Sequence, residues 1–152
     1  RTMRIEGDRD QLMREGDAAW LELCAVLDAA HADVPLHDPD SPEWTSRYVY
    51  THFWRMHTGS THAIRDELGT GEPYQWSDLD ENELNERNAA IDRVISPEDA
   101  RRVAIESRDD YRALVASLTE EQFESIGRRH GDDLLGGHYR GHLDYIRAAS
   151  EG

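Results

Sequence analysis

Histidine is the residue of this sequence whose positions best suit metal chemistry. The chain contains eight histidines, and His138 and His142 stand four residues apart. On a helix this spacing places both rings on one face, one turn apart, where they can bind the same ion. His52 falls on the inner face of an earlier predicted helix. We therefore expect two facing helices to bring three imidazoles to one point.

Three neutral ring nitrogens suit Zn²⁺, Ni²⁺ or Fe²⁺ and leave coordination positions open for water or substrate. A divalent ion held in this way polarises a carbonyl or lowers the pKa of a bound water or thiol. The alternative is that each of the three rings is a hydrogen-bonded core histidine, because buried histidines more often have structural roles.

Two further residues are candidates for catalysis. Arg55 lies one turn beyond His52 and could hold a substrate carboxylate, although a surface ion pair is its simpler role. Viewed down the predicted C-terminal helix, Tyr145 projects in a direction between those of His138 and His142. It could donate to a bound oxyanion or belong to the core.

Four other polar residues have more than one possible role. Asp110, at the edge of an apolar helix face, could accept the outer N–H of a ligating histidine or reach solvent. His57 falls opposite His52 and is expected at the surface, whereas His62 lies on the flank and stays undecided. Cys24 is expected to be a small buried apolar residue, because a nucleophilic role would need a base beside it.

Helices must position these residues, because apolar residues recur at helical spacing and no stretch alternates with period two for long enough to predict a strand. Ser41–Pro42 and Ser96–Pro97 each combine a capping hydroxyl with a proline, which is typical of helix starts. Thr119 and Gln122 have the spacing of a capping box. The first predicted helix ends near Ala32, and the second spans Pro42 to Leu68. A short helix is expected inside Asp80 to Ile95. The next helix begins at Pro97, and the last lies within Asp132 to Ala149.

Four main helices in a single domain over residues 1–152 predict an all-α four-helix bundle. A helix from Pro42 to Leu68 is about 40 Å long at about 1.5 Å per residue. The segment from Gly69 to Ile95 is long enough to return along that length. The second and third main helices are therefore expected to run parallel, in up-down-down-up order with a long crossover.

Charge and composition narrow the classes of partner. The chain has 17 Lys+Arg against 32 Asp+Glu, so its net charge is −15 and it should repel nucleic-acid phosphates. Its one cysteine cannot form an intramolecular disulfide, which favours a reducing compartment. No apolar run approaches the roughly 18 residues of a membrane helix. We expect a cytoplasmic protein with a small-molecule substrate and no nucleic-acid or membrane partner.

Three stretches of the sequence resemble the DinB-like superfamily of helical bundles. The run WTSRYVYTH, from Trp44 to His52, is similar to the W-S-x-x-x-v-x-x-H stretch of that superfamily. The run GGHYRGH, from Gly136 to His142, resembles its C-terminal H-x-x-x-H. The region of Trp76, Asn85 and Asn88 looks like the connector of the ClbS/DfsB-like branch.

The likeness covers roughly Asp10 to Ala149 and implies an up-down-down-up bundle. It also implies a divalent metal on the three matching histidines, His52, His138 and His142. The superfamily contains mycothiol-dependent maleylpyruvate isomerases and bacillithiol transferases. The resemblance therefore implies a detoxification-type enzyme whose metal activates mycothiol, another low-molecular-weight thiol, or water against a small electrophile.

The resemblance also implies a homodimer, for which the outward aromatic residues Tyr50 and Trp54 are the expected interface. Two alternatives to the thiol transferase stay open. One is a ClbS/DfsB-like resistance protein that hydrolyses or sequesters a reactive natural product. The other is a non-catalytic dimeric binding module whose histidines are structural.

Overall fold

Helices make up the regular structure of this protein. The computed structural model describes residues 7–36, 43–131 and 136–151. In chain order its elements are α1 (Arg9–Ala29), α2 (Ser46–Thr70), α3 (Glu81–Asp92), α4 (Pro97–Ser117), α5 (Glu120–Gln122), the π-helical turn η1 (Phe123–Gly127) and α6 (Gly137–Glu151). Within the described ranges, β pairing is limited to an isolated bridge between Pro35 and Thr45. The predicted all-helical class is confirmed.

The predicted helix starts are observed at two of the three places. Ser96 caps α4 by accepting a hydrogen bond from the Asp99 N–H at 3.1 Å. Thr119 and Gln122 exchange the two hydrogen bonds of a capping box. The third start, Ser41–Pro42, lies outside the described residues, and α2 begins at Ser46 with Thr45 as its cap.

The helix ends differ from the predicted ones by two or three residues. The first helix stops at Ala29, because Ala30 is extended and its N–H bonds to the Leu27 carbonyl. At the other boundary, α2 continues to Thr70. Gly71 ends it with a φ of 73°, a left-handed conformation that suits glycine, and donates to the Glu67 carbonyl at 2.9 Å.

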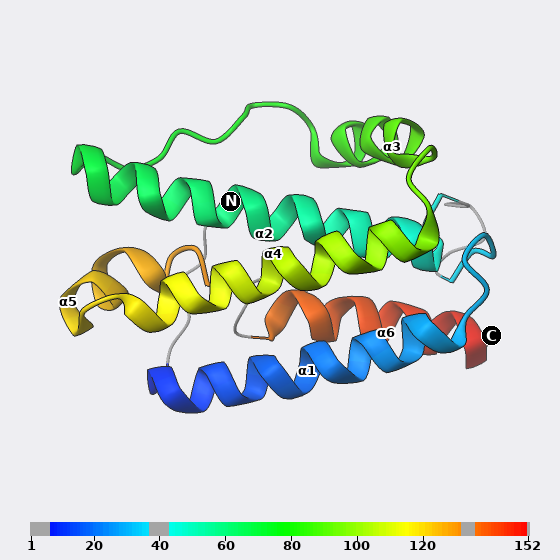
Figure 1. Cartoon of the computed structure of the whole chain (residues 1–152), viewed down its shortest axis with the longest axis horizontal. Coiled ribbons are helices and arrows are strands. Elements are labelled where there is room, and N and C mark those ends of the chain that lie inside the picture. Colours follow the sequence, from blue (N-terminus) through cyan, green and yellow to red (C-terminus); the bar gives the residue numbers. More distant parts are fainter. Residues whose placement is uncertain (1–6, 37–42, 132–135, 152) are drawn as a thin grey trace.

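The four long helices lie roughly along one direction, with α2 beside α4 and α1 beside α6 (Figure 1). The connector of residues 71–96, which contains α3, runs back over α2 before α4 begins (Figure 1). None of the helices in the described part of the chain has the length and hydrophobicity that crossing a bilayer requires.

The central helix α2 is buried around most of its circumference, which overturns two predictions. Tyr50 is 3% exposed, and its hydroxyl lies 2.5 Å from a carboxylate oxygen of Asp28, so it is not a surface interface residue. His57 is fully buried instead of lying at the surface. Both predictions assumed that this helix buries a single face, whereas α2 contacts α1, α3 and α4. Of the two aromatic residues that were expected to point outward, Trp54 alone is partly exposed.

The core around the middle of α2 contains the aromatic residues Trp20, Tyr50, Phe53 and Tyr139. Trp20 meets Phe53 edge to face, with ring centroids 5.9 Å apart. Cys24 belongs to the same cluster and is 7% exposed, so its predicted burial is confirmed. Burial raises the pKa of its thiol to about 11.

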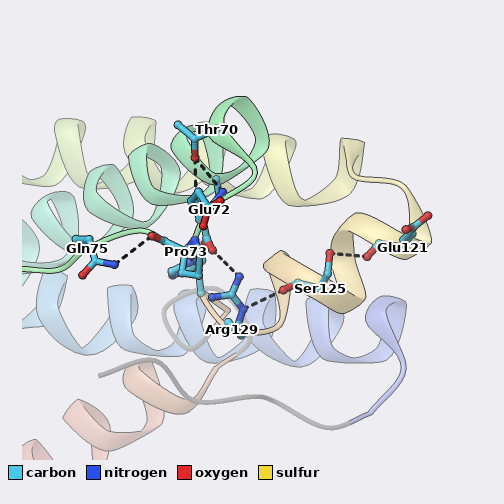
Figure 2. A network of polar contacts seen from close by, with 9 residues as sticks. Thr70, Glu72, Pro73, Gln75, Glu121, Ser125 and Arg129 are labelled. Carbon is cyan, nitrogen blue, oxygen red and sulfur yellow. Dashed lines mark hydrogen bonds and ion pairs between the residues drawn. The ribbon is translucent and has the colours of Figure 1, made fainter.

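Local hydrogen bonds shape the turn where the connector leaves α2 (Figure 2). The Glu72 N–H donates to the Thr70 hydroxyl at 3.1 Å, and the Gln75 amide donates to the Pro73 carbonyl at 3.5 Å (Figure 2). The next aromatic residue, Trp76, lies against Gly59 in the middle of α2. The connector therefore covers the side of α2 that α1 and α4 leave open.

Candidate metal centre

The structure brings together the three histidines that the sequence singled out. His52 comes from the first half of α2, and His138 and His142 lie one turn apart on α6. The Nε2 atom of His138 is 3.1 Å from the Nε2 atoms of both His52 and His142. One ligand atom from each of the three lies within 4.8 Å of the others.

Hydrogen bonding alone does not explain this arrangement of nitrogens. The Nε2 atom of His138 carries either one proton or one lone pair, so it can form one good hydrogen bond and not two. It nevertheless lies at the same 3.1 Å from two other ring nitrogens. An ion placed between the rings would accept all three lone pairs at once.

The distances also fit a divalent ion. Ligand nitrogens about 2.0–2.1 Å from a tetrahedral Zn²⁺ stand about 3.3–3.4 Å apart. The two separations of 3.1 Å that involve His138 are close to this value, and the three ligand atoms all lie within 4.8 Å of one another. Three neutral imidazoles are a donor set that Zn²⁺, Ni²⁺ and Fe²⁺ accept. The residues present therefore fit the predicted ion.

Aromatic residues hold the three imidazoles in place. The Trp44 ring centroid lies 5.1 Å from that of His52 and 5.2 Å from that of His142. Phe53 packs on the other side, 4.8 Å from His138. His52 is 5% exposed and His142 is 6% exposed. This packing restricts ring rotation, so the nitrogens are preorganised for one ion.

A pocket of about 500 Å³ opens above the three histidines. One wall comes from α2 and Trp44 just before it, a second from the connector and α3, and a third from α6. Its apolar lining includes Trp44, Met56, Trp76 and Leu79. This volume suits a small-molecule ligand.

Tyr145 lies at the rim of this pocket, not in the core. Its ring centroid is 6.4 Å from that of His142, and the residue is 66% exposed. The core alternative is therefore wrong. The buried stripe of α6 is Tyr139, Leu143 and Ile146, which turns Tyr145 away from the core. Its predicted role as an oxyanion donor stays a prediction.

Arg55 lies away from the pocket lining and pairs with a buried carboxylate. Its Nε and Nη2 atoms donate to Asp92 at 2.9 and 2.6 Å, and the Asp92 side chain is 3% exposed. This bidentate pair raises the pKa of the Arg55 guanidinium. It joins α2 to the end of α3. The predicted contact of Arg55 with a substrate carboxylate stays untested.

The remaining candidates lie outside the centre. Asp110 is exposed, in agreement with the simpler of its two expected roles. His62 is also exposed, and its ring packs edge to face against Tyr74 with centroids 5.4 Å apart.

Sequence reasoning missed a buried polar network beneath the three histidines. Tyr139, the residue after His138, places its hydroxyl oxygen 2.7 Å from the Nε2 atom of His57. Arg108 donates to the same oxygen at 3.3 Å and pairs with Asp17 at 2.8 Å. Burial raises the pKa of Asp17, but Arg112 and Arg108 outweigh it and hold that pKa below its ordinary value.

A second buried cluster, also missed, lies behind the Trp76 wall of the pocket. Glu67, which is 3% exposed, accepts from the Arg129 guanidinium at 2.5 Å and contacts the Nε2 atom of His130. The rings of His130 and Trp76 are 5.7 Å apart. Glu67 and His130 are 63 positions apart in the chain, so no local spacing could have indicated this pair.

Comparison of the chain with protein-family models, with curated proteins and with solved structures found no match. The functional conclusion therefore depends on the geometry of the three histidines and of the pocket above them.

Proposed function

We propose that this chain is a metal-dependent enzyme of the DinB-like type, with its four long helices in up-down-down-up order. The course of the connector back over α2 supports this order (Figure 1). His52, His138 and His142 hold one Zn²⁺, Ni²⁺ or Fe²⁺ ion. The observation that carries the proposal is the convergence of three Nε2 atoms at the floor of a pocket of about 500 Å³.

The proposed reaction is attack of a low-molecular-weight thiol, such as mycothiol, or of water on a small electrophile. When bound, the ion lowers the pKa of the thiol or water that it coordinates. The other contributions come from the chain itself. Trp44 and Phe53 pack against the imidazoles and hold them in place. The proposed role of Tyr145, which lines the pocket with its ring centroid 6.4 Å from that of His142, is to donate a hydrogen bond to the developing oxyanion.

Metal content measured by plasma mass spectrometry tests the site. We expect about one equivalent in the wild type and in His31→Ala, an exposed histidine that serves as the matched control. His52→Ala and His138→Ala should each lose the metal. Absence of metal from the wild type, even after reconstitution with Zn²⁺, Ni²⁺ and Fe²⁺, would overturn the proposal.

Thiol transfer is tested on the loaded protein with monobromobimane as the electrophile and mycothiol, bacillithiol or glutathione as the thiol. We expect one thiol to be consumed faster in the presence of the wild type than with His52→Ala. Turnover that needs the ion but no thiol would point to water as the nucleophile.

A second candidate function is that of a metal-independent resistance protein of the ClbS/DfsB-like type, which hydrolyses or sequesters a reactive natural product. The observation that favours it is that Trp76 and Asn85, two residues of the connector resemblance, line the pocket. His52→Ala separates the two candidates. In the second one, the variant loses metal but keeps its protective activity.

We also propose a homodimer. With Tyr50 in the core, Trp54 is the remaining interface candidate from the sequence. Sedimentation equilibrium of the wild type and of Trp54→Ala tests this, and a monomeric wild type would overturn it.

A further inference from the structure

We propose that the pocket above the three histidines takes an electrophile with a neutral apolar group, and that Met56, Trp76 and Leu79 form the subsite for that group. The inference deepens the proposed function and rests on it for the position of the reacting atom. It assigns a substrate class and names Leu79 as the residue that determines this specificity.

The apolar subsite lies to one side of the three histidines along α2. Met56 follows His52 by four residues, which places it roughly 6 Å further along the helix axis. Trp76 packs against Gly59, which on the same scale is roughly 10 Å beyond His52. A substrate whose electrophilic atom lies above the histidines would therefore bring an apolar group about 6–10 Å away against this side.

Leu79 is apolar and yet exposed at the mouth of this pocket. The residue is 52% exposed and lines the pocket together with Met56 and Trp76. On the α6 wall of the same pocket, Tyr145 is 66% exposed. Apolar surface gathered around a concave site is typical of ligand-binding grooves, because an apolar ligand that covers it removes it from water.

The backbone holds Leu79 in place on both sides. The Leu79 N–H donates to the Ser77 hydroxyl at 3.2 Å, and the next residue, Asp80, caps α3 by accepting from the Glu83 N–H at 3.1 Å. Leu79 and Leu84 also have the spacing of a hydrophobic staple around this cap. An apolar ligand therefore meets a wall that does not have to order on binding.

The inference does not depend on the charge of the pocket. The proposed ion carries positive charge at the floor, and Glu81 at the rim has an interaction of its own in the folded chain. Both would act on charged ligands. Neutral probes leave the apolar contacts as the difference to be measured.

Three neutral thiols with different tails test the inference. The probes are ethanethiol, 1-butanethiol and 2-phenylethanethiol, titrated into the Co²⁺-loaded protein and followed by the visible thiolate-to-cobalt absorption. The sulfur holds one end of each probe at the ion, so the tail reports on the subsite. We expect both longer thiols to bind roughly tenfold more tightly than ethanethiol, because each buried methylene strengthens binding roughly fourfold. Equal affinity for the three thiols would overturn the inference and leave the proposed function intact.

Variants of two exposed apolar residues supply the control. Leu79→Asn should reduce the advantage of 1-butanethiol over ethanethiol roughly threefold, whereas Leu79→Met should keep it. Ile91→Asn should also keep it, because Ile91 is 54% exposed but lies outside the pocket lining. Ethanethiol, whose tail is short, should bind alike to the wild type and to the three variants. An unchanged advantage in Leu79→Asn would overturn the role of Leu79.

A metal-free measurement keeps the two proposals separate. The probe is 4-nitrobenzyl alcohol, a neutral aromatic quencher of tryptophan fluorescence, and Trp44 and Trp76 line the pocket. We expect saturable quenching of the metal-free wild type and of Ile91→Asn at lower concentrations than of Leu79→Asn. If no thiol perturbs the cobalt spectrum but this difference is found, the thiol chemistry fails and the apolar subsite stands. Equal quenching curves for the three proteins overturn the subsite.

Discussion

The positions of the protons around Tyr139 follow from the groups that can donate hydrogen bonds but cannot accept them. The Arg108 guanidinium has no acceptor, so the Tyr139 hydroxyl accepts a hydrogen bond from it and donates one to the Nε2 atom of His57. The ring proton of His57 is then on Nδ1, which faces the Ser107 hydroxyl oxygen at 3.2 Å. Ser107 in turn donates to the Ala104 carbonyl at 3.0 Å. Each member of this buried chain is satisfied by its neighbours.

Removal of one hydroxyl should therefore destabilise the protein. Tyr139→Phe leaves Arg108 and His57 without this partner, and we expect a loss of about 1–3 kcal/mol in the free energy of unfolding. Tyr145→Phe, which removes an exposed hydroxyl from the same helix, should change it by less than about 0.5 kcal/mol. Urea unfolding measures both. Equal stability of the two variants would contradict the role assigned to Tyr139.

The thiol of Cys24 should be unreactive in the native protein. Its burial raises the pKa to about 11, so roughly one thiol in a thousand is ionised at pH 8. We expect Ellman's reagent to leave Cys24 unmodified in buffer and to titrate it fully in guanidinium chloride. Rapid labelling without denaturant would show that the thiol is accessible and would contradict its burial in the core.

For the individual helices, the features that the sequence predicted correctly are those that depend on residues close together in the chain. Ser96 and Thr119 cap their helices as expected, and the four-residue spacing of His138 and His142 places both rings toward one point. The burial of Tyr50 and His57 was not predictable in this way. It depends on Asp28 of α1 and Tyr139 of α6, which become neighbours of α2 only in the folded chain.

The end of α2 depends on one buried carboxylate. Glu67→Gln removes the carboxylate that pairs with Arg129 and contacts His130, and we expect a destabilisation of about 1–3 kcal/mol at neutral pH. Glu72→Gln, an exposed carboxylate just beyond α2, should be nearly neutral. Thermal unfolding of both variants measures the difference, and similar melting temperatures would contradict the prediction.

The contribution of Glu67 should also depend on pH in a defined direction. Burial raises the pKa of Glu67, but its bonds with Arg129 and His130 outweigh this and hold the pKa below the ordinary value of 4.5. A lowered pKa stabilises the folded state above the unfolded value and ceases to do so as the pH falls through the folded value. The wild type should therefore lose its advantage over Glu67→Gln below pH 4.5, and a gap that widens on acidification would contradict this.

For the whole molecule, the polar network joins all four long helices. It runs from Asp17 on α1 through Arg108 on α4 and Tyr139 on α6 to His57 on α2. The three histidines lie on α2 and α6, so the same packing that satisfies this network also sets the distances between their Nε2 atoms. The candidate metal centre is thus a property of the complete fold and not of one helix.

Ion binding should consequently stabilise the whole domain. A ligand that binds only the folded state at one hundred times its Kd adds about 2.7 kcal/mol, which raises Tm by roughly 5–10 °C in a domain of this size. We expect this rise on addition of Zn²⁺ to the metal-free wild type and to His31→Ala, but not to His52→Ala. Because His52 is the one member of the three-histidine group on α2, its loss leaves two candidate ligands on α6 and none on α2. Differential scanning calorimetry measures the shift, and an equal shift in all three proteins would place the bound zinc elsewhere.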